Sequence, residues 1–327
     1  MSQSKSAHVN SIDALRGMAS LSVVLFHFTG GFLALDNPLR VANSYGYLGV
    51  DAFFVISGFV IPMSFAQKNY DILKFWVFFK KRFVRIEMAY WVSIFLMLFK
   101  EIASSLISDY RYFKWPDHTF WNIFLHFLHG NDFFNEPWLQ AVYWTLSIDW
   151  QFYIFVALLF FIIKRPEFWV RYPLYAALVA VKWYFPETLK PWLFYHIMFF
   201  LPGIVIFHFR RGFMSKWEFY LILTVIFYYV QLKMGWNHFT SITLSCFIIE
   251  FLNRRLRVTA YLGKISYSMY LTHIFSGWWV TSAMLKYPTA EMNKGIAVII
   301  GIIVSVIFAR LFYEYVEKPT QEWARKV

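Results

Sequence analysis

The sequence predicts an all-α membrane protein, a polytopic bundle of about ten transmembrane helices with both termini in the cytoplasm. The 327 residues are 59% hydrophobic and 23% aromatic, whereas soluble domains are about 45–50% apolar. Only 15% of the residues are charged, against about 25% in soluble domains. Apolar stretches long enough, or nearly long enough, to cross a bilayer recur along the whole chain, separated by short polar connections.

Ten apolar stretches account for the predicted spans, and the 15 Trp and 21 Tyr suit the two membrane interfaces. The run 119–129 is too short and too rich in His to cross comfortably, so we expect an interfacial or re-entrant piece on the outer side. The predicted spans lie at about 13–33, 47–65, 83–99, 141–163, 172–185, 192–209, 217–232, 240–253, 264–284 and 295–313.

Basic residues orient this bundle. With the N-terminus cytoplasmic, 20 of the 31 Lys and Arg residues fall at or near cytoplasmic ends and 9 at outer ends. Counting 119–129 as a further span would place most of them outside. The net charge of +12 therefore reflects topology, the expected surrounding is a lipid bilayer, and no nucleic-acid partner is expected. The lone Cys246 excludes an internal disulfide and a Cys-based metal site, and no metal is expected.

The chain is expected to form a single integral-membrane domain over residues 1–327, without a fused soluble domain. The first apolar stretch contains Arg16, and no convincing cleavage site follows it. We therefore expect it to be a membrane helix of the mature protein and not a secretory signal.

Two ionisable residues, Arg16 and His27, lie inside the first predicted span. Their spacing of eleven residues places them about 20° apart on one helix face and about 16 Å apart along the axis. Arg16 then lies near the cytoplasmic boundary and His27 near the midplane, where an ionisable group is costly unless it faces the bundle interior. His27 is either a neutral histidine with one interhelical hydrogen bond or a proton carrier in a cavity; the second is favoured.

Further polar residues are predicted at membrane depth on other helices. Asp149 in YWTLSIDWQFY and His273 in LGKISYSMYLTHI are expected at a depth similar to that of His27. Asp51, in GVDAFFVISGF, is expected nearer the outer surface, and Gly58 follows on the same face, where another helix can approach closely. These residues favour a polar chamber, and a carboxylate beside a histidine suits removal of a proton from a hydroxyl.

A basic cluster precedes the third predicted span: Lys80, Lys81, Arg82 and Arg85. Arginine forks bind phosphates well, so the cluster is a candidate phosphate site. It is equally well explained as a cytoplasmic loop that orients its helices. The spacing alone does not separate the two interpretations.

Six stretches, in order along the chain, resemble the motifs of the acyltransferase family 3 membrane proteins. SIDALRGMASLSVVLFHF is similar to the family's Arg-x10-His segment, and GVDAFFVISGF to its second-helix motif. KKRFVRI resembles its Arg-x-x-Arg motif, and YWTLSIDWQFY its Trp-x-Leu-x-x-Glu motif. LGKISYSMYLTHI and FYEYVEKP are similar to the closing helices, so the resemblance runs from residue 11 to 319.

The resemblance implies a ten-helix O-acyltransferase of the stand-alone type that modifies polysaccharide or O-antigen. Such proteins take an acyl group, often acetyl, from cytoplasmic acyl-CoA and pass it to a glycan hydroxyl outside the bacterial inner membrane. The family's functional positions correspond to Arg16 and His27, and its Arg-x-x-Arg pair to Arg82 and Arg85, near the entry point of acyl-CoA.

Two positions depart from the family's pattern. Asp149 stands where a Glu is usual, which keeps the charge but shortens its reach by one methylene. Ile86-Glu87-Met88 follows the Arg-x-x-Arg pair where Ile-Tyr-Pro is common, so the local backbone is expected to differ.

These observations combine into one expected mechanism. The phosphates of acetyl-CoA would lie at the cytoplasmic mouth, and its pantetheine arm is roughly as long as the distance of about 16 Å from Arg16 to His27. His27 would take the proton of the acceptor hydroxyl, a contribution of about 10²–10⁴ in rate, with Asp149 or Asp51 orienting it. The residues expected to contact the substrates are Arg16, Arg82, Arg85, Lys81, Ser57, His273 and Trp144.

Three points stay open in the sequence. A nucleophile at Ser57 or Ser147 is less favoured, because neither stands in a Gly-x-Ser-x-Gly motif and Ser in membrane helices often bonds to its own backbone. The outer segment 110–143, with Trp115, Trp121 and Trp138, is either an interfacial belt, which we favour, or a surface for sugar rings. A proton-coupled exporter explains the buried ionisable groups equally well, although no paired broken helices appear.

Overall fold

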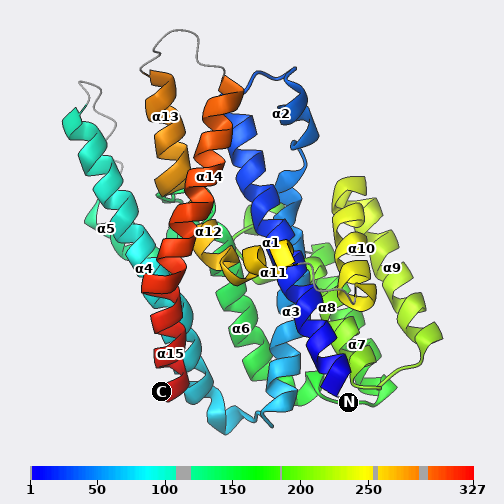
Figure 1. Cartoon of the computed structure of the whole chain (residues 1–327). Coiled ribbons are helices and arrows are strands. Elements are labelled where there is room, and N and C mark those ends of the chain that lie inside the picture. The colour runs from blue at the N-terminus through cyan, green and yellow to red at the C-terminus, as the bar shows by residue number, and fades with distance from the viewer. Residues whose placement is uncertain (1, 108–118, 185, 253–256, 287–293) are drawn as a thin grey trace. The chain divides into compact units, whose positions relative to one another are not determined.

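The chain is helical, as the sequence predicts. The computed structural model describes residues 2–107, 119–184, 186–252, 257–286 and 294–327, and the regular structure of these residues is all helix (Figure 1). In chain order the α-helices are α1 (Ser2–Phe32), α2 (Pro38–Ala42), α3 (Gly49–Gln67), α4 (Phe75–Ile107), α5 (Phe120–Phe127), α6 (Trp144–Ile163), α7 (Phe168–Tyr184), α8 (Leu193–Arg210), α9 (Lys216–Met234), α10 (Trp236–Phe251), α11 (Arg257–Lys264), α12 (Ser266–Thr272), α13 (Trp279–Lys286), α14 (Lys294–Phe312) and α15 (Lys318–Lys326).

Each of the ten predicted spans overlaps one or more of these helices, which confirms their helical character. Among the described residues, four helical segments are long and apolar enough to cross a membrane: Pro38–Gln67, Trp144–Ile163, Leu193–Arg210 and Lys294–Lys326. The protein is therefore an all-helical membrane protein. The ten-span topology and the cytoplasmic location of both termini stay predictions.

The structure refines the predicted boundaries at three places. Helix α4 is longer than the predicted span 83–99, because the basic stretch before it consists of residues that favour helix. The predicted span 264–284 is interrupted at Ile265, whose ψ of 7° is not helical, and again by a π-helical turn at Ile274–Trp278. The run 119–129 forms the short helix α5, whose first turn is capped by the Thr119 hydroxyl.

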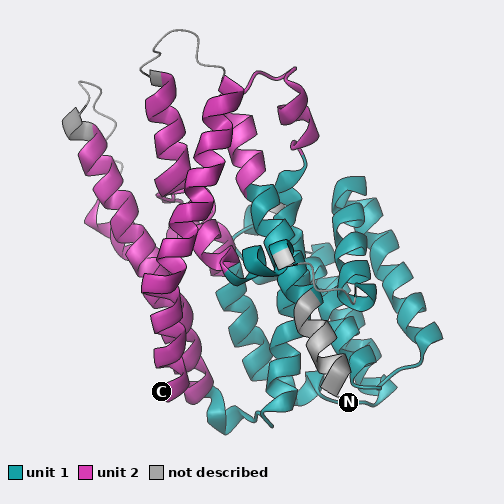
Figure 2. Ribbon diagram, viewed as in Figure 1, with its two compact units in different colours: residues 1–23, 45–75, 148–264 teal, residues 24–44, 76–147, 265–327 magenta. Residues whose placement is uncertain are grey.

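The helices divide into two compact units (Figure 2). Unit 1 comprises residues 1–23, 45–75 and 148–264, and unit 2 comprises residues 24–44, 76–147 and 265–327. Helices α1 and α6 contribute residues to both, as does α4 through its first residue, Phe75.

Unit 1 has its core where α3 packs on α8. At this crossing a Cβ on Gly58 would lie 2.1 Å from the Phe200 carbonyl oxygen, and one on Gly203 would lie 2.2 Å from the Val55 carbonyl oxygen. The two backbones thus approach as closely as glycine permits, which confirms the expectation of a close approach at Gly58. The rings of Phe54, Phe152 and Phe200 stack beside the crossing.

Unit 2 has a similar crossing, formed by α14 and the π-helical turn that follows α12. A Cβ on Gly277 would lie 1.9 Å from the Gly301 carbonyl oxygen. The last turns of α1 pack beside it, where the Trp278 ring meets Phe28 and Phe32. This packing holds the part of α1 that contains His27 next to α12.

Candidate active site

The strongest candidate for acid–base chemistry is a pair of histidines in unit 2. The Nδ1 atom of His27, on α1, lies 3.0 Å from the Nε2 atom of His273, at the end of α12. The rings are nearly parallel, with an interplanar angle of 12°. His273 is fully buried and His27 is half-buried. Both residues were predicted from the sequence, and the structure places them in contact.

The surroundings of His273 fix the tautomers of both rings. Its Nδ1 atom lies 3.0 Å from the Met269 carbonyl oxygen and 2.9 Å from the Tyr270 carbonyl oxygen. Carbonyl oxygens only accept hydrogen bonds, so this Nδ1 carries the proton and Nε2 of neutral His273 is an acceptor. The Nδ1 of His27 must then donate, which leaves Nε2 of neutral His27 with its lone pair, the state that a general base requires.

The local backbone next to His273 explains its position. The N–H of Trp278 donates to the His273 carbonyl oxygen at 3.1 Å, five residues back, which is the hydrogen bond of a π-helical turn. Such turns occur as single insertions within α-helices, frequently at functional sites. Here the turn begins directly after the histidine.

A second pair, formed by a histidine and a carboxylate, lies in unit 1. The Nδ1–H of His238, on α10, donates to Oδ2 of Asp51, on α3, at 2.8 Å. Asp51 is buried, and His238 is half-buried between the rings of Tyr47 and Phe199. The imidazole that Asp51 orients in this unit is therefore that of His238. His238 was not predicted from the sequence, because it precedes the predicted span 240–253 and has no motif around it.

Asp149 also has a partner in unit 1. The hydroxyl of Ser57, on α3, donates to Oδ1 of Asp149, on α6, at 3.2 Å. Both side chains were expected at the site, and the structure brings them together. Ser147, the other serine considered as a nucleophile, is buried and donates to the His129 carbonyl oxygen at 3.0 Å.

The remaining predicted site residues lie at helix positions that leave them partly accessible. Arg16 on α1 is half-buried and belongs to unit 1. In unit 2, Arg82 on α4 is half-buried with its guanidinium 5.8 Å from the centre of the Phe78 ring, and Arg85 is exposed one turn later. Lys81 on α4 and Trp144 at the start of α6 also belong to unit 2, and both are half-buried.

Glu87, one of the departures from the family's pattern, belongs to a buried polar cluster in unit 2. Its carboxylate accepts a hydrogen bond from Nε2 of His129 at 2.9 Å, and both side chains are buried. The His129 ring stacks on Tyr90, and its φ of 55° is unusual for a residue other than glycine. His129 was not predicted either, because a histidine in a short outer segment gives no signal of a buried partner.

Trp121 and Trp138, from the same outer segment, are exposed and half-buried, respectively. The Trp138 indole N–H donates to Asp132 at 2.8 Å. Burial raises the pKa of the Asp132 carboxyl, and this hydrogen bond opposes the rise. Trp115 lies outside the described residues.

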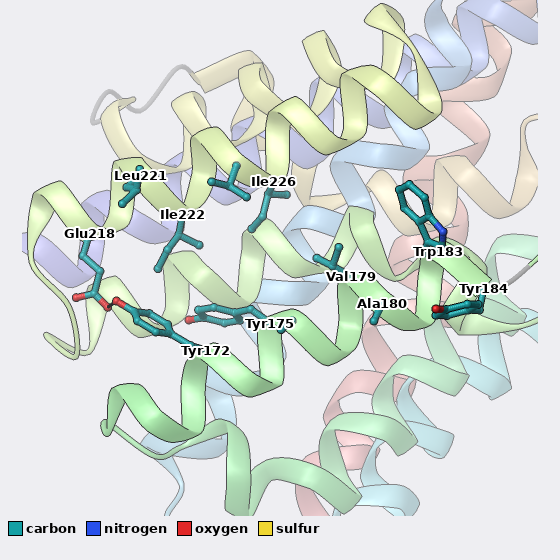
Figure 3. Close-up of a pocket in the computed structure, with 12 residues that line it drawn as sticks. Tyr172, Tyr175, Val179, Ala180, Trp183, Tyr184, Glu218, Leu221, Ile222 and Ile226 are labelled. Carbon is teal, nitrogen blue, oxygen red and sulfur yellow. Dashed lines mark hydrogen bonds between the residues drawn. The ribbon is translucent and has the colours of Figure 1, made fainter.

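An apolar groove of about 710 Å³ lies between α7 and α9 in unit 1. Figure 3 shows Tyr172 and Glu218 at one end of it and Trp183 and Tyr184 at the other. Its lining is almost entirely aliphatic and aromatic, which suits lipid tails better than a charged donor.

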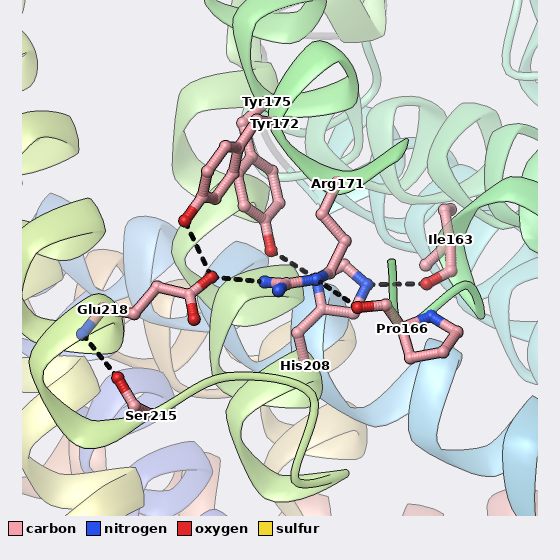
Figure 4. Close-up of polar contacts among 8 residues, drawn as sticks. All are labelled: Ile163, Pro166, Arg171, Tyr172, Tyr175, His208, Ser215 and Glu218. Carbon is pink, nitrogen blue, oxygen red and sulfur yellow. Dashed lines mark hydrogen bonds and ion pairs between the residues drawn. The ribbon is translucent and has the colours of Figure 1, made fainter. Parts of the chain in front are cut away.

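The polar end of the groove is a structural ion pair (Figure 4). Arg171, only 3% exposed, donates to Glu218 at 2.9 Å, and the Tyr172 hydroxyl donates to the same oxygen at 3.0 Å. Tyr175 bonds to Nδ1 of His208, whose Nε2–H donates to the Ile163 carbonyl oxygen at 2.6 Å. These bonds join α7 to α8 and α9, so we assign the cluster to stability.

Among the described residues, no three His, Cys, Asp or Glu side chains gather as a metal site. The candidate acid–base groups are the His27–His273 pair in unit 2 and the His238–Asp51 and Ser57–Asp149 pairs in unit 1.

Comparison with known proteins finds two O-acetyltransferases among the similar proteins. O-acetyltransferase OatA of Staphylococcus aureus is 30% identical over 166 residues, which cover 47% of this chain and 25% of that protein. Peptidoglycan O-acetyltransferase OatA of Listeria monocytogenes is 27% identical over 204 residues, covering 55% of this chain and 30% of that protein. The chain thus matches about a quarter to a third of the length of these relatives.

A relative of similar length also matches. The ORF330 protein of Acidianus two-tailed virus is 26% identical over 291 residues, which cover 80% of this chain and 82% of the viral protein. No solved structure matches the chain. The profile of the acyltransferase domain family matches residues 9–314, which contain all ten predicted site residues and both histidine pairs. The chain therefore belongs to this acyltransferase family.

Proposed function

We propose that this protein is a membrane O-acyltransferase that moves an acetyl group from cytoplasmic acetyl-CoA to a hydroxyl of an extracytoplasmic glycan. Membership of the acyltransferase family and similarity to two O-acetyltransferases support this proposal. The proposed location is a bacterial inner membrane, crossed by about ten helices with both termini in the cytoplasm. The name of the Listeria relative makes peptidoglycan one candidate acceptor, beside exopolysaccharide, O-antigen and lipid-linked sugars.

The observation that carries the proposal is the hydrogen bond from His27 to His273. It holds His27 with its Nε2 lone pair unprotonated. In the proposed reaction this nitrogen takes the proton of the acceptor hydroxyl while the hydroxyl oxygen attacks the thioester carbonyl carbon. The carbon–sulfur bond then breaks, and the imidazolium returns the proton to the departing thiolate of CoA. The products are an O-acetyl ester and free CoA.

The donor is proposed to enter beside α4. Arg82 and Arg85 lie one turn apart on that helix, so both guanidinium groups can address the same phosphates of CoA. Lys81 and Arg16 add positive charge at the predicted cytoplasmic ends of their helices. The rise of about 16 Å from Arg16 to His27 on α1 is comparable with the length of a pantetheine arm.

The remaining site residues take supporting roles in this proposal. Asp149, hydrogen-bonded by Ser57 within unit 1, is proposed to act through its negative charge. Asp51 acts through His238, and Trp144 at the start of α6 contacts substrate.

A proton-coupled exporter is the second candidate, because a hydrogen-bonded pair of histidines at membrane depth is also suited to relay a proton. Binding of acetyl-CoA distinguishes the two functions, since an exporter of this kind has no need of a thioester. The family match favours transfer.

The testing experiment is calorimetric titration of acetyl-CoA into the protein in nanodiscs. Wild type is expected to bind, and the Arg82→Ala/Arg85→Ala variant to bind at least tenfold more weakly, because several charge-assisted hydrogen bonds are lost. The matched control is Arg325→Ala/Lys326→Ala, which removes the same charge from two exposed positions of α15 and is expected to bind as wild type does. Folded wild-type protein that binds no acyl-CoA would overturn the proposal and favour the exporter.

A further inference from the structure

The Asp51–His238 pair has a geometry that the proposed transfer step does not explain. Asp51 is the third residue of α3, and His238 is the third residue of α10. The pair therefore joins the first turns of two helices, at the end that the predicted topology places outside. The Asp51 side chain is only 6% exposed, whereas 27% of the His238 side chain is exposed.

The carboxylate fixes which edge of the imidazole is available. Because Oδ2 of Asp51 accepts from Nδ1–H of His238, the neutral ring has its lone pair on Nε2, at the opposite edge. Among the described residues, no protein group bonds to that nitrogen. An oriented acceptor atom on a partly exposed ring is suited to receive a hydroxyl hydrogen from a ligand.

The need to hold α3 and α10 together does not by itself explain the Asp51–His238 pair. The Ser241 hydroxyl, one turn after His238, already donates to the Leu48 carbonyl oxygen at 3.0 Å and so joins α10 to the residues before α3. A buried carboxylate carries a desolvation cost that this attachment does not require. A buried carboxylate that orients a partly exposed imidazole therefore points to a function for the exposed edge of the ring.

Aromatic side chains surround the same end of unit 1. The centre of the Tyr47 ring lies 6.2 Å from that of His238, and the Phe199 ring lies 5.3 Å away on α8. Two further rings are largely exposed on the segments that carry the pair, Tyr45 at 58% and Trp236 at 65%. Aromatic faces pack against the apolar faces of sugar rings, while hydroxyls at the ring edge need polar partners.

We propose that His238, oriented by Asp51 and beside the rings of Tyr47 and Phe199, forms a sugar-binding subsite for the glycan acceptor. Nε2 of His238 accepts a hydrogen bond from a pyranose hydroxyl that is not the one acylated, and His27 remains the base of the reaction. Asp51 is a positioning residue, because it acts only through His238. This inference rests on the proposed function, since it assigns a place to the acceptor of that reaction.

The test measures transfer from acetyl-CoA to three pentasaccharides, built from N-acetylglucosamine, mannose and galactose, with the whole protein in nanodiscs. For the best of them, His238→Ala is expected to raise the acceptor KM about tenfold, as loss of one ligand hydrogen bond predicts. The kcat and the KM for acetyl-CoA should stay within about twofold, because the donor site and the base are unchanged. The control is Thr240→Ala, an exposed position of α10 whose hydroxyl donates to the Trp236 carbonyl oxygen of its own helix.

A second measurement does not depend on how the variant folds. In wild type, diethylpyrocarbonate should carbethoxylate His238 at its accessible nitrogen, and a saturating concentration of the same pentasaccharide should reduce that modification several-fold. Modification is read by mass spectrometry of the peptide that contains His238.

The possible failures are distinguishable. If wild type transfers acetyl but His238→Ala leaves the acceptor KM unchanged, or lowers kcat alone, the subsite is overturned and the proposed function stands. Absence of protection by the sugar likewise overturns the subsite alone. If wild type binds acetyl-CoA yet transfers acetyl to none of the three glycans, a glycan acceptor of these sugars is overturned, and the subsite with it.

Discussion

The imidazole of His27 donates a hydrogen bond from Nδ1 to Nε2 of His273, across 3.0 Å and between two helices that are far apart in the sequence. His273 cannot offer a proton at that nitrogen, because two backbone carbonyls hold its proton at Nδ1. The hydrogen bond therefore runs in one direction, with His27 as donor and His273 as acceptor. The buried member sets the tautomer, and the half-buried member presents a basic nitrogen.

Replacing His27 by Ala is expected to lower acetyl transfer by about 10²–10⁴-fold, because the general base is removed. Transfer from radiolabelled acetyl-CoA to glycan is the measurement. Thr29→Val is the control, since the Thr29 hydroxyl donates to the Leu25 carbonyl oxygen of the same helix. A folded His27→Ala protein with full activity would refute the assignment of the base.

Replacing His273 by Phe is expected to give an intermediate rate. His27 remains, but neither of its tautomers is then favoured by a fixed acceptor, so only part of the population presents the required lone pair. Transfer should fall below wild type and stay above the His27→Ala variant under the same conditions. A His273→Phe enzyme as active as wild type would show that tautomer control is unimportant.

The negative charge of Asp149 is expected to contribute more to the rate of acetyl transfer than its hydrogen bond with Ser57 does. Asp149→Asn keeps the shape but removes the negative charge, whereas Ser57→Ala removes only the hydroxyl that donates to it at 3.2 Å. A hydrogen bond to a charged group contributes about 1.5–3 kcal/mol, so the serine variant should lose about 10²-fold at most. Parallel transfer assays compare the two. The proposed role fails if Ser57→Ala is the more damaging change.

Glu87→Ala is expected to destabilise unit 2, because it removes the carboxylate to which buried His129 donates at 2.9 Å. Hydrogen bonds to charged groups contribute about 1.5–3 kcal/mol. Glu87→Gln keeps an acceptor and should be milder. The surface pair of Lys318 with Glu314 provides the contrast, since Lys318→Ala removes an exposed ion pair and should change the melting temperature little. Thermal unfolding in nanodiscs measures all three, and equal shifts for Glu87→Ala and Lys318→Ala would contradict the cluster's role.

Gly58→Ala is expected to destabilise the α3–α8 crossing, because the new methyl group would lie 2.1 Å from the Phe200 carbonyl oxygen. Forced separation of packed elements typically costs about 1–3 kcal/mol. Gly30→Ala on α1 is the matched control. A Cβ there meets nothing within 4 Å, so the change should be neutral or stabilise the helix by up to about 1 kcal/mol. Equal melting temperatures for the two variants would show that the crossing tolerates a side chain.

The sequence predicted most of the local structure. Hydrocarbon requires every backbone polar group to be satisfied within its own segment, so long apolar runs have few alternatives to helix. Helical periodicity then placed His27 on the face of Arg16, and the lack of a side chain at Gly58 indicated a close helix crossing that the structure confirms. The interruption at Ile265 and the π-helical turn after His273 were not predicted, because one inserted residue leaves the apolar pattern nearly unchanged.

The sequence by itself determined that this is a helical membrane protein with the acyltransferase motifs. Composition and the order of motifs along the chain do not depend on which segments pack together. Only the tertiary structure decided which polar side chains meet. Asp51 and His238 are separated by 187 positions, and His27 and His273 by 246. Their pairing depends on which helix faces pack together, and periodicity reveals a face without naming the helix that covers it. The direction of the His27–His273 hydrogen bond follows from two backbone carbonyls, which no side-chain pattern encodes.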